Sequence, residues 1–175
     1  ESLNKKGIEK MLQLGANPNL PMQGGETATW FAAGSDDPEL LRLMLKYGGD
    51  PNIEAEADTA LQLAVKGHRV QNIELLLAAG ADINKSDAVG RTAVASAAGV
   101  EELQMVYDFL EMGSCRGLTD LARWIEASVV AKDSEAGRRK LRVLKMLEDR
   151  GVEFPLPAVV PPPPPDVGKL RREQS

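Results

Sequence analysis

The sequence predicts an all-α solenoid, built from repeated helix-turn-helix units that carry short β-hairpin-like fingers. Two regular spacings predict this fold class. Thr27, Thr59 and Thr92 each open an apolar segment, at steps of 32 and 33 residues. Glycines keep the same step, at Gly15, Gly48, Gly80 and Gly113. A unit of this size is too small to bury its own apolar face, so it buries that face against the next unit.

The chain is expected to begin with half a repeat, residues 1–19. Ile8, Met11 and Leu12 share one face of a helix because they stand at positions i, i+3 and i+4. Gly15 supplies the left-handed residue that ends the helix, and Pro18 prevents its continuation. This unit therefore contributes one helix to the array.

Three full repeats are expected to follow, over residues 20–52, 53–84 and 85–117. Their first helices are predicted at 27–33, 59–66 and 92–98, and their second helices at 38–47, 70–79 and 101–112. Asp36 or Asp37 caps the first of these second helices, with Pro38 in its opening turn. Apolar stripes such as Val70, Ile73 and Leu76 are expected to face inward.

The pattern changes in the last unit, residues 118–157, which we expect to be an atypical capping repeat. Gly113 and Thr119 are only 6 residues apart, so the finger has been deleted, whereas Thr119 and Gly151 are 32 apart instead of 21. The added residues are expected in a longer first helix and in the turn before a last helix over 138–150. That helix is expected to place Leu141, Leu144 and Leu147 inward and polar groups outward, as a terminal cap requires.

The remaining residues, 158–175, form a proline-rich tail. Five consecutive prolines, 161–165, require the extended polyproline II conformation. Pro-rich segments can be ligands for aromatic-lined grooves, but we expect this tail to be a semi-rigid segment, packed along the last helix or free, that adds little to stability.

The second repeat carries a resemblance to a known family. Residues 59–64, Thr-Ala-Leu-Gln-Leu-Ala, stand where the ankyrin repeat family has Thr-Pro-Leu-His-Leu-Ala, and residues 75–77 and 80–84 match its second helix and following turn. The resemblance extends over about residues 7–155, and the short, alanine-substituted repeats look like those of bacterial members. Where the family has His, this chain has Trp30, Gln62 and Ala95. The inter-repeat hydrogen bonds that the family obtains from that His are therefore in question.

Composition limits the classes of function. A net charge of −5 over 175 residues argues against nucleic-acid binding, which needs a basic face. One cysteine, Cys115, and one histidine, His68, are too few for a structural zinc site. No apolar run is long enough for a membrane span. Because the first residue is Glu1, the sequence leaves open a cytoplasmic protein or a periplasmic or secreted one whose signal peptide has been removed.

The residue types that could act in catalysis do not form a catalytic set, so we predict that the chain is not an enzyme and uses no cofactor or metal. His68 is expected in the turn between two helices. Gly24-Gly25 and Gly48-Gly49 lack the Lys and Ser or Thr of a phosphate-binding loop. Acidic pairs such as Glu101 and Glu102 fall at helix starts, without the enclosed pocket that acid-base catalysis needs.

The function that remains is binding of another protein. The resemblance implies a concave face formed by the fingers and first helices, acidic at its centre with apolar flanks, and therefore a partner with a basic or mixed patch. Trp30 is either an anchor for that partner or a filler between repeats. The residues expected to contact the partner are Met22, Gln23, Glu26, Trp30, Glu54, Glu56, Asp58, Lys66, Asp87, Val89 and Arg91.

Several functions fit such a module. The first is a bacterial immunity or antitoxin protein, an inhibitor of a cognate toxin or effector. The others are a host-directed effector or scaffold fragment, and a regulatory domain of a larger enzyme or channel.

Overall fold

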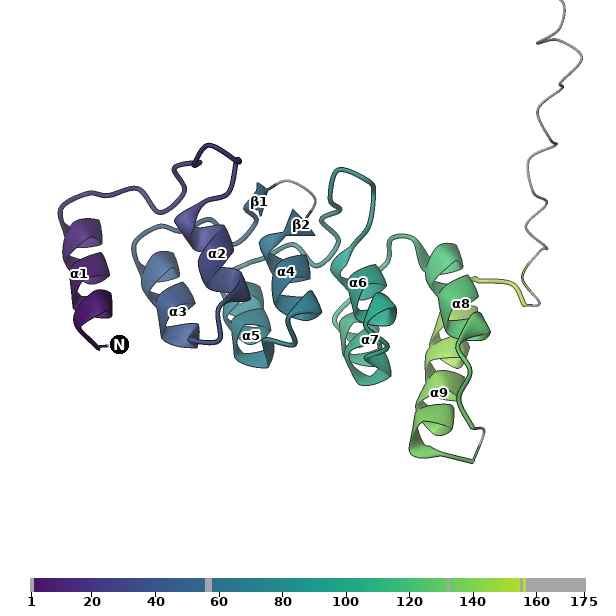
Figure 1. Cartoon of the computed structure of the whole chain (residues 1–175). Helices are drawn as coiled ribbons and strands as arrows, with labels where there is room; N and C mark the ends of the chain where they lie inside the picture. The colour runs from purple at the N-terminus through teal and green to yellow at the C-terminus, as the bar shows by residue number, and fades with distance from the viewer. Residues whose placement is uncertain (1, 56–57, 132, 155, 157–175) are drawn as a thin grey trace, which may run out of the picture.

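The computed structural model describes residues 2–55, 58–131, 133–154 and 156. Within these ranges the chain forms nine α-helices and one two-stranded sheet. The N-terminal helix and the helix pairs that follow it stand side by side in one row, which ends at the final helix pair (Figure 1). The fold is therefore the all-α solenoid that the repeat spacing predicts.

The row opens with the single helix α1 (Ser2–Gln13) and continues as four helix pairs. The inner helices are α2 (Ala28–Gly34), α4 (Ala60–Lys66), α6 (Ala93–Gly99) and α8 (Leu118–Ala127). The outer helices are α3 (Pro38–Lys46), α5 (Val70–Ala78), α7 (Leu103–Glu111) and α9 (Glu135–Asp149). Each inner helix packs on the next one, α2 on α4, α4 on α6 and α6 on α8.

The recurring threonines start the inner helices. The Thr27 hydroxyl accepts a hydrogen bond from the backbone N–H of Trp30. Thr59 accepts one from the N–H of Gln62, whose side chain in turn accepts from the Thr59 N–H, forming a capping box. Thr92 occupies the same position without a side-chain cap bond. These threonines are buried between repeats, which explains why they mark the period.

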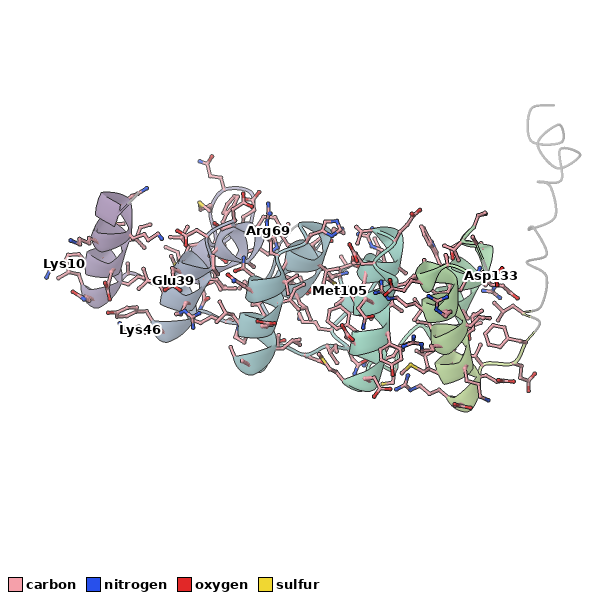
Figure 2. All side chains as sticks on the ribbon, turned by 90° about the horizontal axis from the view of Figure 1, so that it is seen from below. Lys10, Glu39, Lys46, Arg69, Met105 and Asp133 are labelled. Atoms are coloured by element: carbon pink, nitrogen blue, oxygen red, sulfur yellow. The ribbon has the colours of Figure 1, made fainter. Side chains whose placement is uncertain are left out.

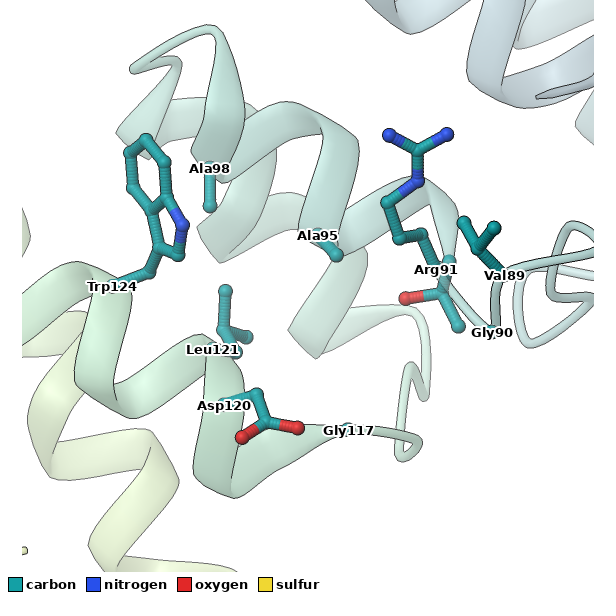
Figure 3. A pocket seen from close by; sticks show the side chains of 10 residues that line it. Val89, Gly90, Arg91, Ala95, Ala98, Gly117, Asp120, Leu121 and Trp124 are labelled. Carbon is teal, nitrogen blue, oxygen red and sulfur yellow. The ribbon is translucent and has the colours of Figure 1, made fainter. Parts of the chain in front are cut away.

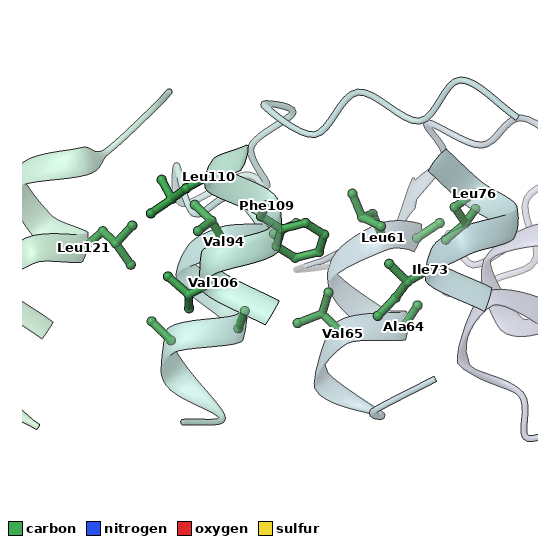
Figure 4. Packing of buried hydrophobic residues seen from close by; sticks show 14 of the residues in the cluster. Leu61, Ala64, Val65, Ile73, Leu76, Val94, Val106, Phe109, Leu110 and Leu121 are labelled. Carbon is green, nitrogen blue, oxygen red and sulfur yellow. The ribbon is translucent and has the colours of Figure 1, made fainter. Parts of the chain in front are cut away.

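The core is continuous through the row, as Figure 4 shows for its middle part. Small residues such as Ala64 and Ala97 are fully buried on the inner helices, so neighbouring helices approach closely. The space between inner and outer helices is filled by larger side chains, among them Leu76, Phe109 and Leu110. An array of thin units thus obtains its core by stacking.

A ladder of asparagines joins the turns that close successive repeats. The Asn52 amide donates from Nδ2 to the carbonyl of Gly80 at 3.2 Å, and its Oδ1 accepts from the N–H of Asp82 at 2.7 Å. The same pair of bonds links Asn19 to the turn at Gly48 and Asn84 to the turn at Gly113. Because each bond crosses to the next repeat, the ladder fixes the spacing of the units.

The final helix pair differs from its prediction in three details. Thr119 does not cap α8: it lies inside the helix and is exposed, while Gly117, at φ 65°, holds the cap position. The last helix begins at Glu135 because the Ser134 hydroxyl accepts from the N–H of Gly137. Leu147 is buried as predicted, but Leu141 is 60% exposed and Val143 is buried in the core in its place.

Changing Gly80 tests the register of the repeats. Gly80 has φ 91°, a left-handed conformation that a β-branched residue adopts only with strain. An added Cβ would meet no atom within 4 Å, so backbone strain is the whole effect. We predict that Gly80→Val lowers the free energy of unfolding by more than about 1 kcal/mol, measured by urea denaturation. Gly99→Val, at the end of helix α6, is the control. Equal stability of Gly80→Val and wild type would show that the repeat boundaries are wrong.

Removing the tail tests where the fold ends. Residues 158–175 lie outside the described residues, as does the polyproline run within them. Phe154 and Leu156, which precede the tail, pack against the core. We therefore predict that truncation after Pro157 changes the melting temperature by only a few degrees, about the shift of a 1 kcal/mol effect or less. A large drop would show that the tail belongs to the folded unit.

Candidate protein-binding surface

Three fingers project from the row at the start of the inner helices (Figure 1). In the first, the Met22 N–H bonds to the Glu26 carbonyl at 2.8 Å. The second is a true antiparallel pair, β1 (Glu54–Ala55) with β2 (Asp58–Thr59). In the third, the Asp87 N–H bonds to the Arg91 carbonyl at 2.9 Å. The predicted hairpin-like fingers are thus present, and the short loop before α8 has none.

The fingers bring most of the predicted contact residues to one side of the row. Met22, Gln23, Glu54, Val89 and Arg91 are exposed. Glu26, Trp30, Asp58 and Lys66 are half-buried, Asp87 is buried, and Glu56 lies outside the described residues. The exposed set forms the surface that we call the finger face, together with the inner helices beneath it.

The charge of the finger face differs from the expectation of an acidic centre. Glu54 pairs with Lys85 at 3.3 Å, and Asp58 pairs with Lys66 and, at 3.8 Å, with Arg91. These basic side chains stand between the acids of neighbouring fingers, so the fields of the carboxylates do not simply add. The face is therefore mixed in charge and carries ion pairs.

Asp87, which was predicted to contact the partner, is buried in the third finger. Its carboxylate accepts hydrogen bonds from the backbone N–H groups of Val89 and Arg91, from Arg91 Nε at 2.9 Å and from Gln62 Nε2 at 3.1 Å. Burial alone would raise the pKa of this carboxyl, but the bonds from Arg91, Gln62 and Val89 outweigh it and hold the pKa below its usual range. Asp87 therefore shapes the third finger from within.

In the first two full repeats, the residue three positions after the threonine links its repeat to the next finger. Trp30 donates from Nε1 to the carbonyl of Asp58 at 3.1 Å, and Gln62 donates from Nε2 to the carbonyl of Arg91 at 3.0 Å. These are the inter-repeat bonds that the sequence left in question. Trp30 thus spans two repeats, beside the exposed ring of Phe31. Ala95, at the same position of the third repeat, has no side-chain donor.

A notch opens above Ala95, where the fourth finger is missing. It has a volume of about 280 Å³. Arg91 and Val89 border it on one side and Asp120 on the other, over a floor of Ala95, Ala98 and Leu121 (Figure 3). Trp124 of α8 closes one end and is 53% exposed. This ring also lines a second hollow, of about 210 Å³, with Ile125 and Val129.

Sequence reasoning missed Trp124. The signal was the coincidence of a deleted finger with a Trp on the helix that follows it. We call the 280 Å³ hollow the Trp124 notch.

The opposite surface, formed by the outer helices, carries charged side chains of both signs (Figure 2). Lys46 pairs with Glu9 at 3.2 Å, and Arg42 pairs with Glu39 at 3.1 Å. Such pairs on an exposed surface contribute little to stability. This side provides sites for control substitutions.

His68 and the acidic side chains are the remaining candidate groups in the described part of the chain. His68 lies in the turn between α4 and α5 with φ 55°, and its Nδ1 is 3.3 Å from Glu102. Over the described residues, no three His, Cys, Asp or Glu side chains lie together as metal ligands would. None of the helices in these ranges has the length and apolar character needed to cross a bilayer.

The geometry defines a class of protein, a stacked array of helix pairs with projecting fingers. Residues 2–87, about half of the chain, match the family model described as ankyrin repeats in three copies. The chain belongs to the ankyrin repeat family. The ankyrin repeat is a non-catalytic unit of protein–protein interaction.

Several curated proteins are similar over the repeats. The potassium channel AKT1 of rice (Oryza sativa subsp. indica) is 38% identical over 91 residues, 49% of this chain and 10% of the channel. The nuclear factor NF-kappa-B p105 subunit of Gallus gallus is 32% identical over 92 residues, 50% of this chain and 9% of that protein. Zygote-specific protein 3 of Chlamydomonas reinhardtii is 36% identical over 110 residues, 63% of this chain and 29% of that protein. The chain thus spans a tenth to under a third of the length of these relatives.

Proposed function

We propose that this chain is a protein-binding module that holds its partner on the finger face. The observation that carries the proposal is the common side of the row on which the fingers and inner helices present exposed side chains. Val89 and Met22 supply apolar contacts there, and Glu54 and Arg91 supply charges of both signs. A surface with apolar contacts and a polar rim is typical of specific protein interfaces.

The charge pattern favours a partner whose own patch is mixed in sign. Lys85 Nζ lies 3.3 Å from Glu54 Oε2, and both side chains remain accessible to solvent. A partner with an alternating pattern can pair with both groups, whereas a uniformly basic one would meet Lys66, Lys85 and Arg91 as well. Complementarity of this kind governs partner choice and association rate more than affinity.

Site-specific photo-crosslinking tests the choice of face. A photoreactive amino acid at Val89, which is 70% exposed on the third finger, is compared with one at Leu141, which is 60% exposed on α9. In extracts of the source cell, we expect a discrete crosslinked protein from the Val89 position and none from Leu141. The reverse pattern would place the partner on the outer helices and contradict the proposal.

A second candidate is a regulatory module of a longer protein. It is favoured by the length comparison, because the matched repeats are a small part of the rice channel and of the p105 subunit. The hypothesis of a bacterial immunity or antitoxin protein rests on size and charge alone, and these relatives give it no support. Adjacent coding sequence separates the two: a continuous reading frame supports the module, and a neighbouring toxin-like frame supports the immunity protein.

A further inference from the structure

The Trp124 notch presents chemical groups suited to binding an extended, proline-rich segment. The Trp124 indole nitrogen faces the notch in Figure 3, toward Ala98. Among the described residues its N–H has no acceptor, whereas the indole of Trp30 donates to the Asp58 carbonyl of the next finger. The two rings occupy different places on their helices: Trp30 is three residues after the cap residue Thr27, and Trp124 is seven residues after the cap residue Gly117. An exposed ring with an open donor, beside small apolar residues, offers packing and one directed hydrogen bond.

Polyproline II matches these two features. Its backbone makes no internal hydrogen bonds, so each carbonyl is free to accept, and its proline rings pack against aromatic side chains. The ordering cost is low because the proline rings already fix the backbone. A run of prolines therefore fits the notch better than a flexible apolar segment.

This chain carries such a run close by, at residues 161–165. Leu156, the last described residue, packs against the core of which the final helix pair is part. The five steps from Leu156 to Pro161 extend up to about 17 Å, and α8, with ten residues, is about 15 Å long. The linker can therefore span the length of α8, the helix that carries Trp124.

We propose that residues 158–165 dock in cis, with the prolines in the Trp124 notch beside Val89 and Arg91 of the third finger, until a partner on the finger face displaces them. Covalent linkage gives the tail an effective concentration in the millimolar range. Weak docking is then sufficient for appreciable occupancy, and it leaves the melting temperature nearly unchanged on truncation. The docking itself is independent of the proposed function; the competition with a partner rests on it.

Nuclear magnetic resonance of the full chain, labelled with ¹⁵N, tests the docking. The chain has two indole N–H signals, from Trp30 and Trp124, and Trp124→Phe assigns them. We expect replacement of all five prolines 161–165 by Ser to move the Trp124 signal by more than its linewidth and to leave that of Trp30 in place. Phe31→Ala, at an exposed aromatic residue of α2, is the control and should leave the Trp124 signal unchanged.

Two results would overturn the docking. One is an identical Trp124 signal in wild type and in the proline variant. The other is a shift that depends on protein concentration, which would assign the notch to the tail of a second copy. The competition is tested with the captured partner, which should bind the proline variant several-fold more tightly than wild type. Equal affinity of the partner for the proline variant and wild type would contradict the competition. The proposed function is tested separately, by whether finger substitutions abolish binding of the partner.

Discussion

Replacing Phe109 by Ala is expected to lower the free energy of unfolding by about 3–5 kcal/mol, the range for truncating a buried Phe. Phe109 is the largest fully buried side chain among the described residues, and it lies between α6 and the helices of the second repeat (Figure 4). In a solenoid each unit contacts only its neighbours, so no other part of the chain fills the cavity. Urea denaturation followed by circular dichroism measures the change.

Met112→Ala is the matched control for Phe109→Ala. Met112 follows α7 directly and is exposed, so its truncation should change the free energy of unfolding by no more than about 0.5 kcal/mol. If the two variants unfold at the same urea concentration, the third repeat does not pack as described.

Replacing Asp87 by Ala is expected to cost about 2–3 kcal/mol. The substitution leaves the buried Gln62 amide and the N–H groups of Val89 and Arg91 without their shared acceptor, and hydrogen bonds to a charged group are the more costly to lose. The third finger should open, while Glu54→Ala, at an exposed acid of the second finger, should be nearly neutral. Near-wild-type stability of Asp87→Ala would contradict the structural role.

The same carboxylate predicts a pH dependence. Because the pKa of Asp87 is lowered in the folded state, its contribution to stability is present above the ordinary pKa of Asp and is lost as the pH falls through the folded-state value. Asp87→Asn cannot ionise, so it should be less stable than wild type at neutral pH. The difference in free energy of unfolding between wild type and Asp87→Asn should decrease in acid. A constant gap from neutral pH to acid would show that the charge of Asp87 is unimportant.

The fold could be predicted because its determinants are local. Thr27 and Thr59 cap helices within their own repeats, and Gly80 ends one. The same residue types therefore recur at the same positions of each repeat. The rotation of the last helix was not predictable from its own residues. Leu141 and Val143 are both apolar, and only packing against α7 and α8 selects the second.

The candidate site was less predictable because it depends on neighbours in space. In the sequence, Asp87 is indistinguishable from an exposed acid of a finger. The fold places Gln62, 25 residues earlier, within hydrogen-bond distance of its carboxylate. Trp124 is exposed at the end of the notch that opens where the fourth finger is missing. In both cases the decisive contact lies between repeats, where a one-repeat pattern carries no information.

Binding kinetics of the captured partner test the central claim, that the finger face is the interface. Surface plasmon resonance compares a finger variant, Glu54→Lys with Glu56→Lys, and a notch variant, Trp124→Ala, with Arg42→Glu and Glu74→Lys on the outer helices. We expect the finger variant to slow association and reduce its salt dependence, the notch variant to change affinity, and the outer variants to bind as wild type does. Unchanged binding of the finger and notch variants, with loss of binding in the outer ones, would contradict the account.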